Sequence, residues 1–118
     1  MMQASEKRTF LEYAVAERRA IWSLASGVAF ISRRDYQRWG IALHLEVGAL
    51  GPDQLRATLT RRFCEADRYD QYFLFLNLQG ELVVWRATPA HAIDIHSLDR
   101  ICQEHLMLAG LDHLRRVD

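Results

Sequence analysis

The sequence predicts a single α+β domain in which an antiparallel sheet packs against amphipathic helices. Three observations lead to this fold class. Two apolar segments within Tyr72–Arg86 are joined around Gln79 and Gly80, which is typical of a β-hairpin. The segment Trp39–Val47 alternates along its whole length with the period of a strand. Apolar residues elsewhere recur at helical spacing, so we expect the order α-β-β-α-β-β-α, with helices on one face or end of the sheet.

The first helix is expected to begin at Ser5, a good N-cap residue, and to end at the pair Ser26 and Gly27. The residues at helical spacing between these ends are Leu11, Ala14, Val15, Arg18, Ile21, Trp22 and Ala25. A short strand, Val28–Ile31, is expected after this helix, followed by a polar connection over Arg33–Arg38.

The next strand has two distinct faces. One face carries Trp39, Ile41, Leu43, Leu45 and Val47, and the other carries Gly40, Ala42, His44 and Glu46. A second helix is expected to begin at Pro52, because the first helical position does not need a backbone N–H. Its apolar side is formed by Leu55, Leu59, Phe63 and Ala66.

The hairpin is apolar on both of its faces. Tyr72–Leu76 and Leu82–Trp85 are continuous apolar runs, which need a cover on each face from the chain's own helices or from another chain. A polar turn over Asp67–Gln71 precedes the hairpin. After it, Ile93 and Ile95 predict a short extended piece, Ser97 caps the last helix, and Gly110 ends or bends that helix.

Composition places limits on function. The chain of 118 residues is expected to be one domain, 1–118, and its 15 basic and 15 acidic side chains cancel. A neutral chain has no broad field to attract nucleic acid or an anionic membrane. The N-terminal segment lacks the apolar core of a signal peptide, and no run of about 18 apolar residues is present, so we expect a cytoplasmic protein. Cys64 and Cys102 are expected to be reduced thiols rather than a disulfide.

Catalytic and metal-binding motifs are not apparent in the residues. None of the histidine spacings matches a helical zinc site, so we expect no metal and no cofactor. Asp94 and His96 could form an acid–base pair on one strand face, but no nucleophile motif accompanies them. We therefore expect a protein that is not an enzyme, with a small enzyme using these two residues as an alternative.

Protein binding is the function class that the residues favour. An apolar edge strand is a template for strand addition, and a helix with a wide apolar stripe is suited to a two-fold dimer. The main alternative is a nucleic-acid-binding regulator that stacks bases on the sheet aromatics Tyr72, Phe73, Phe75 and Trp85. Arg86 is the one basic residue adjacent to these aromatics in the sequence. Base-stacking surfaces usually have more basic residues around them.

The order of elements resembles the small cytosolic chaperones of bacterial type III secretion. The stretch FLFLNLQGELVVWRATP followed by IDIHSLDRICQEHLMLAGLDHL is similar to the hairpin and closing helix of that family, and GPDQLRATLTRRFCEADRY occupies the place of its dimer-forming helix. Those chaperones are usually acidic, whereas this chain is neutral. The resemblance therefore implies either of two roles: a secretion chaperone, or a regulatory adaptor like the Hrp-type negative regulators.

The resemblance implies a set of site residues. Leu55, Leu59 and Phe63 would form a homodimer or heterodimer interface. An exposed part of the sheet would hold segments of a protein partner, which could be a secretion substrate, a sister chaperone or a transcription activator. The residues implied in partner binding are Trp39, Ile41, Leu43, Phe75 and Trp85.

Overall fold

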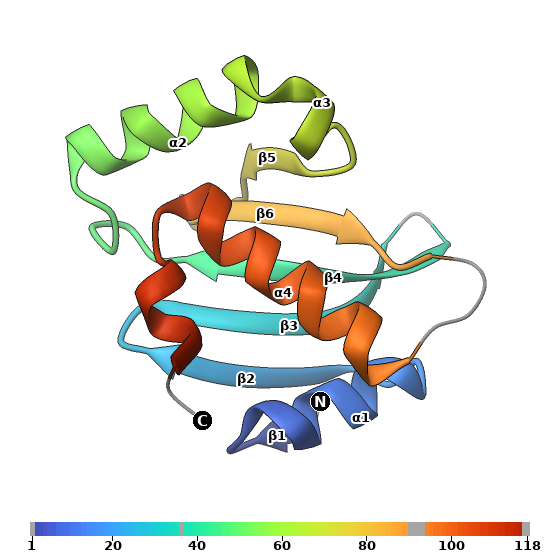
Figure 1. Cartoon of the computed structure of the whole chain (residues 1–118). Helices are drawn as coiled ribbons and strands as arrows, with labels where there is room; N and C mark the ends of the chain where they lie inside the picture. The colour runs from blue at the N-terminus through green and yellow to red at the C-terminus, as the bar shows by residue number, and fades with distance from the viewer. Residues whose placement is uncertain (1, 36, 90–93, 117–118) are drawn as a thin grey trace.

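The fold is described from a computed structural model, which places residues 2–35, 37–89 and 94–116 of the chain. Six strands, four α-helices and a 3₁₀ helix are present in this part of the chain (Figure 1). In order they are β1 (Met2–Ala4), α1 (Lys7–Val15), β2 (Ala20–Ala25), β3 (Val28–Asp35), β4 (Arg38–Leu45), α2 (Pro52–Cys64), α3 (Ala66–Tyr69), β5 (Phe73–Leu76), β6 (Leu82–Ala87), α4 (Ile95–Ala109) and η1 (Asp112–Arg116).

The strands form one sheet in the order β1-β2-β3-β4-β6-β5. All neighbouring strands are antiparallel except β1 and β2, which are parallel because α1 connects them as a crossover. The predicted α+β fold class with an antiparallel sheet is therefore confirmed. The strand β5 lies at one edge and pairs only with β6 in the described part of the chain.

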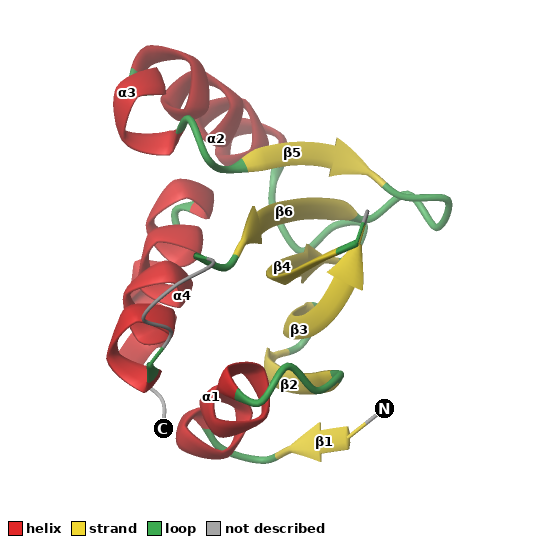
Figure 2. Ribbon diagram, turned by 90° about the vertical axis from the view of Figure 1, so that its right-hand side faces the viewer, coloured by secondary structure: helices red, strands yellow, loops and turns green. Residues whose placement is uncertain are grey.

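One face of the sheet is covered by helices. Figure 2 shows α1 and α4 on the same side of the sheet, with no helix on the other side among the described residues. A chain of rings runs through the core between these layers: Phe10 of α1 contacts Trp22 and Phe30 of the sheet. His105 of α4 continues this chain from Phe30 to Tyr72, with ring centroids 5.8 and 5.1 Å apart respectively.

The predicted first helix is too long. All seven predicted elements occur in the predicted order, but α1 ends at Val15, and the segment predicted as its second half forms β2 instead. Glu17 adopts a left-handed backbone with φ of 55°, which stops the helix. The helical pattern was misleading because Trp22 also fits a strand period of two, on which it points into the core while Ile21 does not.

Other boundaries also differ. The predicted connection Arg33–Arg38 belongs mostly to β3 and β4, and part of the predicted turn Asp67–Gln71 is the short helix α3. Asp94, rather than Ser97, caps α4, because its Oδ1 accepts a hydrogen bond of 2.7 Å from the Ser97 amide. Ile95 is therefore helical, and Ile93 lies outside the described residues. Gly110 ends α4 with a left-handed φ of 74°, as predicted.

Candidate partner-binding surface

The face of the sheet that α1 and α4 leave uncovered is the most distinctive surface of the molecule, and we call it the open face. Successive residues of a strand point to opposite faces, so each strand contributes every second side chain to it. Strand register places five of these side chains in one row across β2, β3, β4, β6 and β5. They are Ile21, Ile31, Ala42, Trp85 and Phe73, each paired with the next.

This row is apolar along its whole length. A sheet face that meets only water normally carries polar side chains, so an apolar row indicates that something covers it in the functional state. Phe73 remains 56% exposed at the end of the row, and Phe75, on the same face of β5, remains 41% exposed. The open face therefore has the composition of a contact surface.

Trp85 is fixed at the centre of the open face by its neighbours. Its indole lies against Gly40 of β4, where a Cβ atom would be only 2.5 Å from Cζ2 of the ring. The guanidinium of Arg33 lies over the ring, 5.7 Å from its centroid. The glycine thus lets the large ring approach the backbone of β4, and the arginine restrains it there.

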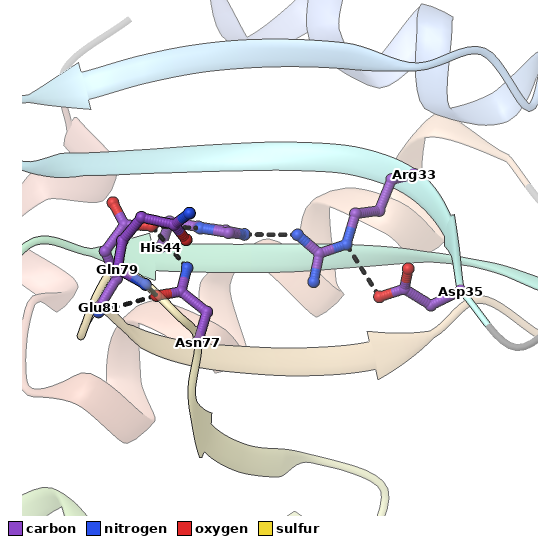
Figure 3. A network of polar contacts seen from close by, with 6 residues as sticks. All are labelled: Arg33, Asp35, His44, Asn77, Gln79 and Glu81. Atoms are coloured by element: carbon purple, nitrogen blue, oxygen red, sulfur yellow. Dashed lines mark hydrogen bonds and ion pairs between the residues drawn. The ribbon is translucent and has the colours of Figure 1, made fainter.

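A polar network crosses the open face (Figure 3). Arg33 donates from Nε to Asp35 over 2.9 Å and from Nη1 to Nε2 of His44 over 2.6 Å. His44 in turn contacts Glu81 through Nδ1 at 3.2 Å. Asn77, in the same β5–β6 loop as Glu81, donates to the same Glu81 oxygen over 2.7 Å. The contact between Glu81 and His44 thus joins this loop to β4. The network holds Arg33 and the loop in fixed positions around the apolar row.

The network also fixes the protonation state of His44. Since a guanidinium can only donate, Nε2 of His44 must be unprotonated, and the hydrogen is on Nδ1 facing Glu81. Burial lowers the pKa of His44 below its ordinary value, although the hydrogen bond to Glu81 opposes this effect. Hydrogen bonds from Asn77 and His44 lower the pKa of Glu81. At neutral pH the network therefore contains a neutral imidazole between an arginine and a carboxylate.

Two hollows lie on the open face on either side of Arg33. The first, of about 540 Å³, lies over β2, β3 and β4 and is closed at one end by the β5–β6 loop. The second, of about 710 Å³, is lined by Arg33, Asp35, Phe73, Phe75 and Trp85. The second hollow reaches the free edge of β5, where backbone groups have no strand partner in the described chain. An extended segment could pair with this edge and place side chains in the hollow.

The helix α2 forms a second contact surface. Its side chains that face the body are polar and donate to backbone carbonyls: Gln54 to Gly110 over 3.4 Å, Arg61 to Leu108 over 2.5 Å and Arg62 to Tyr72 over 2.8 Å. Thr58 is the buried residue of this helix. A helix that packs on its own domain usually turns its apolar side inward, so the arrangement in α2 is the reverse of the common one.

The apolar stripe of α2 points away from the body. Leu55, Leu59 and Phe63 are 37%, 49% and 83% exposed, and they follow one another at helical spacing. The family resemblance assigns these three residues to a dimer interface. Their exposure agrees with an interface position, and the contact itself is a proposal taken up below.

The implied partner-binding residues divide between the core and the surface. Phe75 and Trp85 lie on the open face, and Trp39 is half-buried near the start of β4. Ile41 and Leu43 are fully buried in the core, because the face of β4 that carries them is the one α4 covers. Those two residues have no exposed side chain for a partner, so the prediction that they bind one is wrong. Val47 lies beyond the end of β4 and is exposed.

Several residues of the open face were not identified from the sequence. Ile21 was assigned to a helix, and Ile31 and Arg33 were assigned to the end of a short strand and a loop. The signal that could have found them is the pair Ser26 and Gly27, which is a hairpin turn between β2 and β3. Interpreting that pair as a turn would have identified β2 as a strand, and the register shift between Ser23 and Ala25 then places Ile21 opposite Ile31.

Catalytic and metal-binding groups do not gather in the described part of the chain. No group of three histidine, cysteine or carboxylate side chains there is placed to hold a metal ion. Asp94 is used as the cap of α4, so Asp94 and His96 do not share a strand. Both cysteines are free, as expected, with Cys64 exposed and Cys102 buried. None of the described helices has the length and apolar character to cross a bilayer.

The fold and the open face define a small α+β protein in which the described helices cover one side of the sheet. A family model described as HrpV-like matches residues 1–113, nearly the whole chain. The chain belongs to the HrpV-like family, which is associated with Hrp type III secretion. A search of curated proteins gives no match. The predicted connection with type III secretion is therefore confirmed at the level of the family.

Proposed function

We propose that the protein is a non-enzymatic binding protein of type III secretion, acting in the cytoplasm as a chaperone or as a regulatory adaptor. The observation that supports this most strongly is the apolar row from Ile21 to Phe73 on a sheet face that none of the described helices covers. A secretion substrate, a sister chaperone or a transcription activator would cover this row. The membership in the HrpV-like family supports the secretion context.

Binding would combine two kinds of contact. The free edge of β5 would pair with the backbone of an extended partner segment, which supplies affinity with little dependence on sequence. The hollow beside Trp85 and Phe75 would take an apolar side chain of that segment, which supplies specificity. The network around Arg33 would keep the aromatic wall in place before the partner arrives.

The helix α2 would join two subunits. Its exposed stripe of Leu55, Leu59 and Phe63 would pack against the same stripe of a second copy, or against a sister protein with a similar helix. This contact is separate from the open face, since α2 is held to α4 and to the residue that precedes β5 by the hydrogen bonds described above. A dimer would thus leave both open faces accessible.

The proposal is tested by affinity capture from the native bacterium with tagged wild-type protein and two variants. Phe73→Glu places a charge on the apolar row, whereas Val47→Asp changes an exposed apolar residue that lines neither hollow on the open face. We expect the same bound proteins with wild type and Val47→Asp, and their loss with Phe73→Glu. A captured effector or translocator identifies a chaperone, and a captured activator or sister chaperone identifies an adaptor. Capture that does not depend on Phe73 would contradict the proposal.

Nucleic acid is a weaker alternative for the same aromatics. The described residues that line the two hollows include one arginine and three carboxylates, Asp35, Glu46 and Glu81. Such a surface repels phosphate. A bound nucleic acid in the capture experiment, released steeply by salt, would favour this alternative.

A further inference from the structure

A third surface lies on the helix side of the molecule, away from the open face. It is a hollow of about 350 Å³ between α3, the end of β6 and the first half of α4. Its floor is formed by the buried residues Tyr72 and Ile101, and its rim carries Arg68, Arg86, Arg100 and Glu104. Three arginines therefore surround one hollow in a chain whose charges cancel overall.

The charges of this rim are only partly neutralised from within. Arg68 donates to Glu104 over 3.1 Å and also lies 3.7 Å from Glu65, so these carboxylates are already paired. Arg86 lies over the ring of Tyr72, 5.2 Å from its centroid, and donates weakly to the Ala87 carbonyl. Among the described residues, neither Arg86 nor Arg100 is paired with a carboxylate. Two positive charges therefore face the hollow without an acidic partner.

The chemistry of the walls indicates which anion fits. A phosphate is usually held by backbone amides at a helix N-terminus, but that position in α4 is occupied by the carboxylate of Asp94. Glu104 on the rim would also repel a dianion more strongly than a monoanion. The apolar parts of Tyr72, Pro89 and Ile101 suit the methylene groups of an acidic side chain.

We propose that this hollow binds an acidic side chain of a protein partner through Arg86 and Arg100. This inference rests on the proposed function, because it adds a second contact for the same partner. An acidic residue in the hollow would neutralise the two guanidinium groups, which lack a carboxylate partner among the described residues, with charge-assisted hydrogen bonds. It would also make partner binding depend on charge, which the apolar open face does not do.

The test is a titration of the full chain, at low salt, with a blocked tetraglutamate peptide, followed by NMR of the arginine Nε–H signals. The matched probes are a tetraglutamine peptide and inorganic phosphate. We expect tetraglutamate to shift the Arg86 and Arg100 signals and the two matched probes to leave them unchanged. Arg100→Gln should weaken peptide binding by about tenfold, the usual effect of losing a charged hydrogen bond. Arg56→Gln, an exposed change on α2, should have no effect.

Three results would overturn the inference. They are the absence of shifts with tetraglutamate, equal binding of phosphate, and equal peptide affinity in Arg100→Gln and wild type. The probe is synthetic and needs no secretion partner, so a negative result refutes only the inference that the hollow binds an acidic side chain. If Phe73→Glu does not change capture, the proposed function is contradicted, whereas the titration result is not affected.

Discussion

The indole of Trp85 lies against Gly40 of the neighbouring strand, and the guanidinium of Arg33 lies over the same ring. This relationship is possible only because position 40 has no side chain. It places a large ring in the middle of a sheet face that has no helix over it among the described residues. The stability of the sheet and the shape of the open face therefore depend on the same glycine.

Gly40→Ala should destabilise the protein by about 1–3 kcal/mol, the usual cost of overpacking. The new Cβ would lie 2.5 Å from Cζ2 of Trp85 and 2.6 Å from the Arg86 carbonyl oxygen, and the latter atom belongs to the backbone and cannot move aside easily. Urea unfolding followed by tryptophan fluorescence measures the effect. Gly51→Ala is the control, since nothing lies within 4 Å of its added Cβ. Equal stability of the two variants would show that Trp85 does not occupy this position.

Stability should fall as the pH is lowered from 7 to 5, by about 2 kcal/mol from His105 alone. Complete burial lowers the pKa of His105 to about 4, although the carbonyls of Ile101 and Ile41 oppose this effect. The unfolded chain takes up a proton near pH 6.5 and the folded chain does not, so acid favours unfolding over this range. His44 adds to the loss in the same direction.

The contribution of His105 is isolated with His105→Gln, which cannot titrate. The variant should be less stable at pH 7, because it breaks the packing between Phe30 and Tyr72. Its stability should nevertheless change less between pH 7 and pH 5 than that of wild type. An identical pH dependence in both proteins would mean that His105 is accessible to solvent protons.

Leu59→Asp should dissociate the proposed dimer without unfolding the subunit. Leu59 is half exposed on the outer side of α2, so the charge is tolerated in the monomer and excluded from an apolar interface. We expect the dissociation constant to rise by about thirtyfold or more, which corresponds to about 2 kcal/mol. Sedimentation equilibrium measures it, with Thr60→Asp, an exposed change beside the stripe, as the control. A Leu59→Asp variant that loses its circular dichroism would place Leu59 in the core.

Asp94→Ala should destabilise the protein, because it removes the N-cap of α4. The carboxylate accepts the Ser97 amide, and this hydrogen bond also lowers the pKa of Asp94. Asp94→Asn should restore most of the loss because an amide oxygen also caps a helix. Thermal unfolding at pH 7 compares the three proteins. A loss that asparagine does not restore would point to a role of the charge rather than of the cap.

The sequence predicts the fold best where two signals agree. The hairpin was correct because continuous apolar runs and a Gln79-Gly80 turn both indicate it, and Gly110 ended α4 as a C-cap glycine does. The strand at Trp39–Val47 was also identified, with its end two residues too late. Each of these segments has a period or a turn that only one kind of element explains.

The remaining errors have a common physical cause. Ile21 and Trp22 fit a helical period as well as a strand, and only the pairing with β3 decides between them. Which face of a strand is covered is likewise a tertiary property: Ile41 and Leu43 looked suited to a partner, but α4 takes that face. The open face could not be located until the helices were placed, because its residues come from five strands.

The most direct test of the open face as a binding surface is hydroxyl-radical footprinting of the protein with and without its captured partner. Oxidation of side chains reports their exposure one residue at a time. We predict that Trp85, Phe73 and Phe75 lose reactivity in the complex, while Tyr13 on α1 does not change. Unchanged oxidation of these three aromatics in a saturated complex would contradict the account and place the partner elsewhere on the molecule.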